Sequence, residues 1–246
     1  MTSRPARSTS TVLTDAATPK PFNASILDTG ASLNFFATGQ ADLLINVLGS
    51  LSVQLQMPED VIQEILDKES EDARFSRVDR PLNWALRSGH IERLDSRSGI
   101  DPDLDRNVAR LTGVPWEQRQ ARAKDQGERM VIAHARTRAG RGEQIIAFID
   151  DKPAQALAHR NGVNYTDTPS ILRQGARLGF IENWGIMRAI YLRMRPEDGS
   201  RQPTIDHGLP RLDNPDLQRK LRDPAIYEEG AARRAARPGP HTETTG

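Results

Sequence analysis

The chain has 246 residues, long enough for one domain of ordinary size plus appendages, or for two small domains. It carries 34 Lys and Arg against 33 Asp and Glu, a formal net charge of +1, which excludes a globally basic nucleic-acid coat and an acidic tail protein. The absence of cysteine excludes disulfide scaffolds, cysteine-ligated metal sites and thiol catalysis, and the five histidines lack the His-x-x-x-His spacing of a zinc enzyme.

Both ends of the chain have the composition of flexible tails. Residues 1–21 are rich in Ser, Thr and Pro and lack the apolar segment of a secretory signal, so we expect a disordered tail. Residues 196–246 are rich in Pro, Arg and Asp, which predicts a polar, largely irregular extension with a short helix around 216–221. No stretch is long and apolar enough for a membrane span, so we expect a cytoplasmic protein that makes no membrane contact.

Between the tails, residues 22–195 alternate between strand and helix signals. Residues 24–27 predict a buried strand that enters a turn at Asp28-Thr29-Gly30. Further strands are expected at 89–94, 145–149 and 162–165, and helices within 40–55 and at 58–66, 82–86, 127–135, 153–160, 169–179 and 184–195. Residues 67–80 are charged, and residues 96–125 are polar without a clear pattern. Strands that alternate with helices predict an α/β sandwich with a mostly parallel central sheet.

Acidic residues stand where an active site of such a fold would form. Asp28 follows the first strand, and Asp150 and Asp151 follow the strongest one; sites of parallel sheets form at the carboxyl ends of strands. Glu64 lies in one helix and Glu128 begins another. Taken singly, each acid has a structural interpretation as a turn former, helix cap or solvated side chain. Converging carboxylates repel each other unless a cation lies among them, and oxygen ligands suit Mg²⁺ or Mn²⁺.

Four segments, in this order along the chain, resemble the PIN-domain nucleases, the fold of VapC-type toxins: 26–30, 57–64, 127–135 and 149–154. Residues 162–181 resemble the end of the domain in a poorly characterised, toxin-like PIN subgroup. The resemblance covers about residues 23–182 and implies a PIN-like three-layer α/β/α sandwich. Two features depart from the family: residues 65–127 make a longer middle than compact members have, and Asp167 replaces the usual Gly before Thr168.

The resemblance implies a metal-dependent ribonuclease and assigns the site residue by residue. Asp28, Glu64 and Glu128 match three metal-binding acids of the family. The fourth acid is Asp150 by its position at the strand end, or Asp151 by its spacing to the following apolar residue. Two threonines are the expected supporting residues, Thr29 and Thr168. One or two Mg²⁺ or Mn²⁺ ions would then support hydrolysis of RNA phosphodiester bonds to a 5′-phosphate and a 3′-hydroxyl, with no histidine needed as base.

An RNA substrate requires cationic contacts near the acids. Residues 118–142 hold seven basic groups and two acidic ones, although a solvated helix face explains this excess equally well. The candidate substrate-binding residues are Arg129, Arg136 and Lys152. VapC-type relatives usually pair with a small antitoxin and often dimerise, so the resemblance implies an antitoxin protein and a second copy of the chain as partners.

Two alternatives remain open from the sequence. The segment Ile26–Ser32, which contains Asp28-Thr29-Gly30, also matches the active-site signature of aspartic proteases. That chemistry requires two carboxylates that share a proton, so a retroviral-type homodimer with an almost all-β fold would be needed. The other alternative is a non-catalytic PIN-like scaffold that only binds RNA or protein. The presence of all four acidic positions favours the enzyme.

Overall fold

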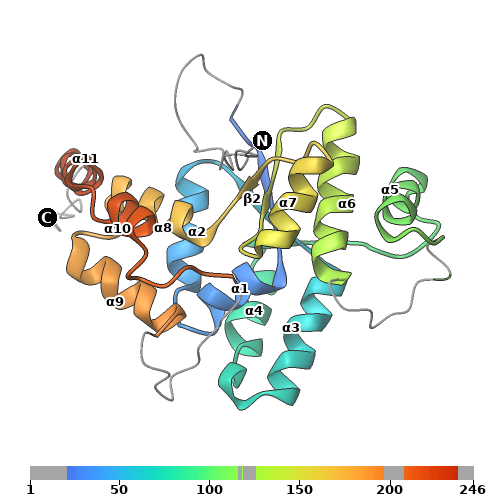
Figure 1. Ribbon diagram of the computed structural model, residues 1–246, viewed down its shortest axis with the longest axis horizontal. Coiled ribbons are helices and arrows are strands. Elements are labelled where there is room, and N and C mark those ends of the chain that lie inside the picture. Colours follow the sequence, from blue (N-terminus) through green and yellow to red (C-terminus); the bar gives the residue numbers. More distant parts are fainter. Residues whose placement is uncertain (1–20, 116–117, 119–125, 197–207, 238–246) are drawn as a thin grey trace, which may run out of the picture.

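The structure is a computed structural model that describes residues 21–115, 118, 126–196 and 208–237. The expected N-terminal tail at 1–21 therefore lies outside the described residues, apart from Pro21. The described chain forms a five-stranded sheet with helices packed on both sides, α2 on one and α6 and α7 on the other (Figure 1). The predicted three-layer α/β/α sandwich is confirmed.

The sheet is parallel at every strand pair. Its strands are β1 (Ala24–Leu27), β2 (Gln54–Pro58), β3 (Ile91–Leu94), β4 (Ile145–Phe148) and β5 (Tyr165–Thr166). Their spatial order is β3-β2-β1-β4-β5, so the order reverses between β1 and β4. Leu27 is in register with Phe148, and the backbone N–H of Asp28 donates to the carbonyl of Phe148 at 3.1 Å. The residues that follow these two strands therefore emerge side by side at the switch point, where open α/β sheets bind ligands.

Twelve helical elements surround the sheet in the described residues. They are α1 (Thr29–Phe36), α2 (Ala41–Ser50), α3 (Glu59–Glu71), the 3₁₀ turn η1 (Ala73–Phe75), α4 (Asp79–Arg87), α5 (Pro102–Thr112), α6 (Gln126–Gly140), α7 (Lys152–Arg160), α8 (Thr168–Arg177), α9 (Trp184–Met194), α10 (Pro215–Leu221) and α11 (Pro224–Ala235). Helix α6 contacts β1, β2 and β4, while α2 packs against β2 and α8. No helix in the described ranges is long and apolar enough to cross a membrane.

The core lies around β1 and β4, whose side chains are buried along their whole length. Both strands read as continuous apolar runs because helices cover both faces of a parallel sheet. The rings of Phe35 in α1 and Phe148 in β4 meet edge to face, with centroids 5.9 Å apart. This contact packs the last turn of α1 against the end of β4.

Three local expectations differ from the structure. Asp28-Thr29-Gly30 does not form a turn between elements; helix α1 begins directly after β1, with Asp28 as its N-cap. Residues 54–58 form β2, where only a connection after the helix was expected. The last strand lies at 165–166 rather than 162–165. Strand β2 alternates Gln with Leu55 and Met57, and pairing with β1 and β3 outweighs the weak strand propensity of these residues.

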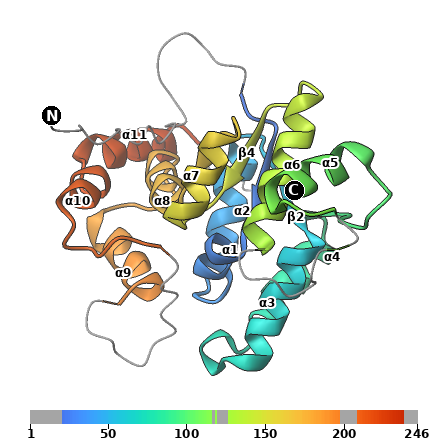
Figure 2. The same ribbon diagram turned by 45° about the vertical axis from the view of Figure 1, so that its right-hand side comes forward.

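The expectation of a largely irregular C-terminal extension is wrong for residues 208–237. This part forms α10 and α11, which pack against α8 (Figure 2). Both helices begin at a proline that follows a capping side chain, Asn214 or Asp223. Five apolar side chains from this part join the main core: Leu209, Leu212, Leu217, Leu221 and Ile226. The folded unit thus extends well beyond residue 195.

Candidate active site

Asp28 occupies the switch point between β1 and β4. It is the N-cap of α1, and its Oδ2 accepts a hydrogen bond from the backbone N–H of Gly30 at 3.2 Å. The side chain is buried, with the residue only 3% exposed. Its other oxygen, Oδ1, is buried without a hydrogen-bond partner among the described residues. A buried carboxylate oxygen without a donor costs free energy, which calls for an explanation beyond capping.

Glu64 reaches the same place from helix α3. Val61 and Ile65 turn into the core, and Glu64 lies half-buried beside them at the edge of the helix. The hydroxyl of Thr29, the residue after Asp28, donates to Glu64 Oε2 at 2.8 Å. Glu64 Oε1 lies 3.9 Å from Lys68 Nζ on the next turn. The Thr29 hydroxyl therefore fixes the Glu64 carboxylate next to the start of α1.

Glu128, the third acid, lies in the first turn of helix α6. The preceding residue, Gly127, has no room for a side chain. An ideal Cβ there would lie 2.5 Å from Glu64 Oε2 and 3.1 Å from the Thr29 hydroxyl oxygen. Glycine thus lets α6 start against the Thr29–Glu64 pair. Gly127 was not among the site residues predicted from the sequence, although a glycine in the first turn of an otherwise regular helix was a signal for it.

The three acids interact electrostatically. Burial raises the pKa of Asp28 well above its usual range, and the negative charges of Glu128 and Glu64 raise it further. Asp28 therefore lies within electrostatic range of Glu64 and Glu128, and we call these three residues the acidic cluster. Their oxygens do not form a ready cage, since no three Asp, Glu or His side chains in the described ranges lie close enough to hold a metal ion.

Asp150 is buried differently from Asp28. It is 2% exposed and accepts three hydrogen bonds, from Asn34 Nδ2 at 2.7 Å, the Thr168 backbone N–H at 2.7 Å and the Thr168 hydroxyl at 2.6 Å. Burial raises the pKa of Asp150 to about 7 even though the Thr168 and Asn34 bonds lower it. Both oxygens are occupied, so this carboxylate ties β4 to α1 and α8. Thr168, expected as a supporting residue, supplies two of its three donors.

Asp151 caps the next helix. Its Oδ1 accepts from the backbone N–H of Ala154 at 2.8 Å at the start of α7, and the residue is half-buried. Oδ2 has no hydrogen bond within the described chain. Of the two acids between which the sequence left the fourth position open, Asp151 is thus the one with an oxygen not engaged by protein donors.

The three expected substrate-binding residues lie in different places. Arg129 is half-buried beside Glu128, and Lys152 is exposed at the start of α7, where its Nζ contacts Gln155 Oε1 at 3.0 Å. Arg136 lies two turns further along α6, about 12 Å from Glu128 along the helix axis. Its Nη1 donates to Asn161 Oδ1 at 3.0 Å, away from the acidic cluster. The basic residues at 119–124 fall outside the described residues.

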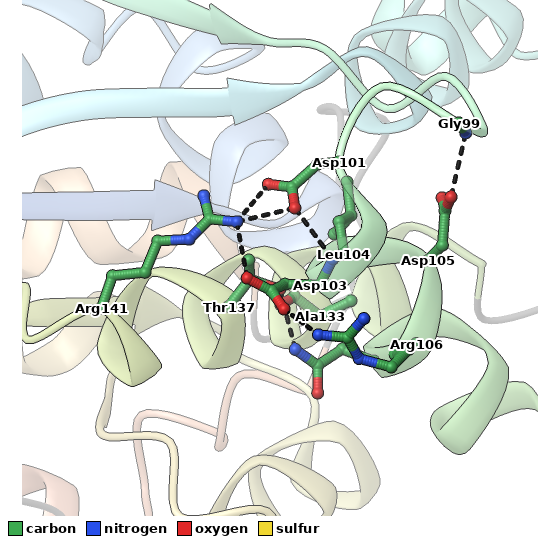
Figure 3. A network of polar contacts seen from close by, with 10 residues as sticks. Gly99, Asp101, Asp103, Leu104, Asp105, Arg106, Ala133, Thr137 and Arg141 are labelled. Atoms are coloured by element: carbon green, nitrogen blue, oxygen red, sulfur yellow. Dashed lines mark hydrogen bonds and ion pairs between the residues drawn. The ribbon is translucent and has the colours of Figure 1, made fainter.

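Arg136 lines a cavity of about 470 Å³ formed by α5, the end of α6 and the residues after α7. The other charged groups of this cavity are paired (Figure 3): Arg141 contacts Asp101 at 2.7 Å and Asp103 at 3.0 Å, and Arg106 pairs with Asp103. The carboxyl-terminal ends of α6 and α7, which carry negative partial charge, also face this region. The cavity's three arginines outnumber its aspartates, but each of them already contacts a protein acceptor, Asp101, Asp103 or Asn161, so none is held ready for an RNA phosphate.

Comparison with known proteins adds no relative to these observations. No protein-family model, curated protein or solved structure matches the chain.

Proposed function

We propose that the protein is a Mg²⁺- or Mn²⁺-dependent endoribonuclease of PIN-like type. The observation that carries the proposal is Asp28. Its carboxylate is buried at the switch point of a parallel sheet, has one oxygen without a donor, and is repelled by Glu64 and Glu128. Such an arrangement is costly for the apoprotein and is relieved by a divalent cation.

The residues fit such an ion by their chemistry. The acidic cluster offers carboxylate oxygens only, which are the ligands that Mg²⁺ and Mn²⁺ prefer. Asp28 would bind through Oδ1, with Glu64 and Glu128 closing the site after small side-chain movements. Asp151 has an oxygen to contribute, whereas Asp150 is engaged by Asn34 and Thr168.

A bound Mg²⁺ would orient the attacking water and stabilise negative charge on the phosphoryl oxygens. The chain's own residues would keep the ligands in place. The Thr29 hydroxyl holds Glu64, and the N–H of Gly30 holds one oxygen of Asp28 and leaves the other without a donor in the described chain. Arg129 and Lys152 are the described basic residues nearest in sequence to the acids and would contact the RNA backbone. A 5′-phosphate and a 3′-hydroxyl are the products that the PIN resemblance implies.

An antitoxin partner, a homodimer and a cytoplasmic location rest on the resemblance or on the default for such a chain, and stay predictions. The aspartic protease alternative fits the structure poorly. Asp28-Thr29-Gly30 lies at the start of a helix in a wholly parallel α/β fold, whereas retroviral-type proteases need an almost all-β fold. The non-catalytic scaffold is the alternative against which the experiment is designed.

The proposal is tested by incubating the purified protein with total RNA, with Mg²⁺ and with EDTA. The variant Asp28→Asn keeps the capping of α1, because Asn caps helices as well as Asp does, but removes the carboxylate. The matched control is Asp213→Asn, since the Asp213 side chain is 67% exposed and its one ion pair among the described residues is with Arg211. We expect Mg²⁺-dependent cleavage by the wild type and by D213N, and none by D28N. Full Mg²⁺-dependent cleavage by D28N would reject the assignment, and no cleavage by the wild type would favour the scaffold.

A further inference from the structure

We propose that residues 208–212, here called the closing segment, pack against the backbone of Asp150 and Asp151, here called the Asp150–Asp151 turn. By holding this turn in place they set the position of the Asp151 carboxylate relative to Asp28. The inference deepens the proposed function and rests on it. The closing segment belongs to the C-terminal part of the chain that the PIN resemblance, which ends near residue 182, does not cover. In Figure 1 the chain before α10 runs from that helix back toward the end of the sheet.

Gly208 makes the contact with the turn. Its φ is +78°, and an ideal Cβ at this position would lie 2.7 Å from the carbonyl oxygen of Asp150 and 3.1 Å from the Cα of Asp151. Both values concern backbone atoms, which cannot rotate away as the end of a side chain can. Position 208 therefore requires glycine for two reasons, the positive φ angle and the close approach to the backbone of Asp150 and Asp151.

The rest of the closing segment is anchored in the core and cannot easily yield. Leu209 and Leu212 are 4% and 3% exposed and belong to the main hydrophobic cluster. Between them, the carbonyl of Pro210 accepts a hydrogen bond of 2.6 Å from the hydroxyl of Tyr191, a fully buried residue of α9. Because the residues after Gly208 are anchored, a clash at Gly208 would press on the Asp150–Asp151 turn.

The turn is then held on two sides. Asn34 and Thr168 bind the Asp150 side chain, and Gly208 packs against the backbone of both aspartates. Because β1 and β4 are adjacent and in register, a shift of this turn changes the position of the Asp151 carboxylate relative to Asp28. The closing segment therefore acts on the metal site through the turn without touching a ligand oxygen itself.

The test compares Gly208→Ala with Gly89→Ala in the full-length chain. Gly89 has a similar φ of +74° but nothing within 4 Å of an added Cβ, so G89A introduces the same backbone strain without the clash. Mn²⁺ affinity is measured by isothermal titration calorimetry, and folding by thermal melting. We expect G208A to bind Mn²⁺ about 10- to 100-fold more weakly than G89A, as is typical when the support of a metal ligand is disturbed. Excess Mn²⁺ should restore RNA cleavage by G208A.

The variant Tyr191→Phe removes only the hydroxyl that holds Pro210, and covers the case that G208A does not fold. We expect Y191F to weaken Mn²⁺ binding in the same direction. If G208A binds Mn²⁺ as tightly as the wild type does, the inference is overturned and the proposed function still stands. If G208A is unfolded, the same conclusion follows when Y191F binds Mn²⁺ as tightly as the wild type does. Absence of Mn²⁺ binding by the wild type would overturn the proposed function and this inference together.

Discussion

Asp28 and Asp150 are buried to a similar degree at the ends of adjacent strands, but their surroundings give them different roles. Asp150 receives three protein donors, so hydrogen bonds offset its burial. Asp28 receives backbone donors at one oxygen, while its other oxygen has no donor in the described chain and two acidic neighbours raise its pKa. Hydrogen bonding thus makes Asp150 a structural anchor, and its shortage makes Asp28 the candidate metal ligand.

The anchor role of Asp150 predicts a specific stability loss for Thr168→Val. The variant keeps the shape of the side chain but removes a donor to a carboxylate that is ionised above pH 7, since the pKa of Asp150 is about 7. We expect a loss of roughly 1–3 kcal/mol in the free energy of unfolding at pH 8, measured by urea denaturation. The loss should be smaller at pH 5.5, where Asp150 is protonated in the folded state.

The control for this prediction is Thr166→Val on β5. Thr166 is 1% exposed, and its hydroxyl has no partner among the described residues, so the same isosteric change breaks no hydrogen bond. T166V should be neutral or stabilising. Equal losses in T166V and T168V would contradict the anchor role.

Gly127 has no side chain and so leaves room for the Glu64 carboxylate, which makes this position sensitive to substitution. Gly127→Ala should raise the Mg²⁺ concentration needed for half-maximal RNA cleavage by about 10-fold or more. The matched control is Gly49→Ala in α2, where an added Cβ meets nothing within 4 Å. G49A should leave the Mg²⁺ dependence unchanged. The same Mg²⁺ dependence in both variants would show that Gly127 does not shape the site.

At the scale of elements, the sequence predicted what depends on local signals. Strand β1 is a short, mostly apolar run, and β4 is short, apolar and rich in isoleucine. The amphipathic pattern of α3 and the carboxylate in the first turn of α6 are also visible in the sequence. Three of the four acidic positions could therefore be assigned to one group. Strand β2 was missed because its Gln-Leu-Gln-Met residues favour a strand only when paired on both sides.

Contacts between distant elements could not be predicted. Asn34 binds Asp150 across 116 residues, and nothing in the sequence near either residue indicates the pair. The same holds for Gly208, whose role appears only when the chain after α9 returns to the sheet. In the C-terminal part the short helix expected around 216–221 is present as α10, but the Pro-, Arg- and Asp-rich composition did not indicate α11 or the packing of this part against the core.

The burial of His134 in α6 predicts a pH dependence of the free energy of unfolding. His134 in α6 is 7% exposed, contacts the Ser96 hydroxyl at 3.1 Å, and has its pKa lowered to about 4, chiefly by burial. The imidazole of His134 takes up a proton near pH 6.5 in the unfolded state but not in the folded state. Its contribution to the free energy of unfolding is therefore fully present above pH 6.5 and is lost as the pH falls toward 4. The loss should reach up to about 3 kcal/mol.

The measurement is urea denaturation of the wild type and of His134→Gln at pH 7.5 and pH 4.5. Other groups titrate over this range in both proteins, so the difference between the two pH dependences reports on His134. H134Q should lose less stability than the wild type on acidification. Equal losses would show that His134 is not held neutral by the fold.

At the scale of the whole molecule, the C-terminal helices are part of the folded unit. Together with the closing segment before them they contribute five buried apolar side chains, three of which lie in the helices. Helix α11 is tied to α8 by the Arg177–Glu229 pair and to the residues after α8 by the hydrogen bond from Arg234 to the Gly179 carbonyl. At about 1.5–3 kcal/mol for each buried side chain, their removal would cost an amount comparable to the total stability of a domain.

Truncation after residue 207 should therefore abolish cooperative thermal unfolding, measured by circular dichroism. The matched control is truncation after residue 237, which keeps α10 and α11 whole and should retain cooperative unfolding. A chain ending at residue 207 that still melts cooperatively at the wild-type temperature would contradict the integration of α10 and α11.

The proposal that Asp28, Glu64 and Glu128 form one divalent-cation site can be tested without RNA. The free energy of unfolding in urea is measured for the wild type and for D28N at pH 8, in EDTA and in saturating Mg²⁺. The pKa of Asp28 is raised in the folded state, so its ionised form opposes folding at this pH. D28N should be more stable than the wild type in EDTA, and Mg²⁺ should stabilise the wild type but not D28N. A wild type that is more stable than D28N in EDTA and unaffected by Mg²⁺ would contradict the account.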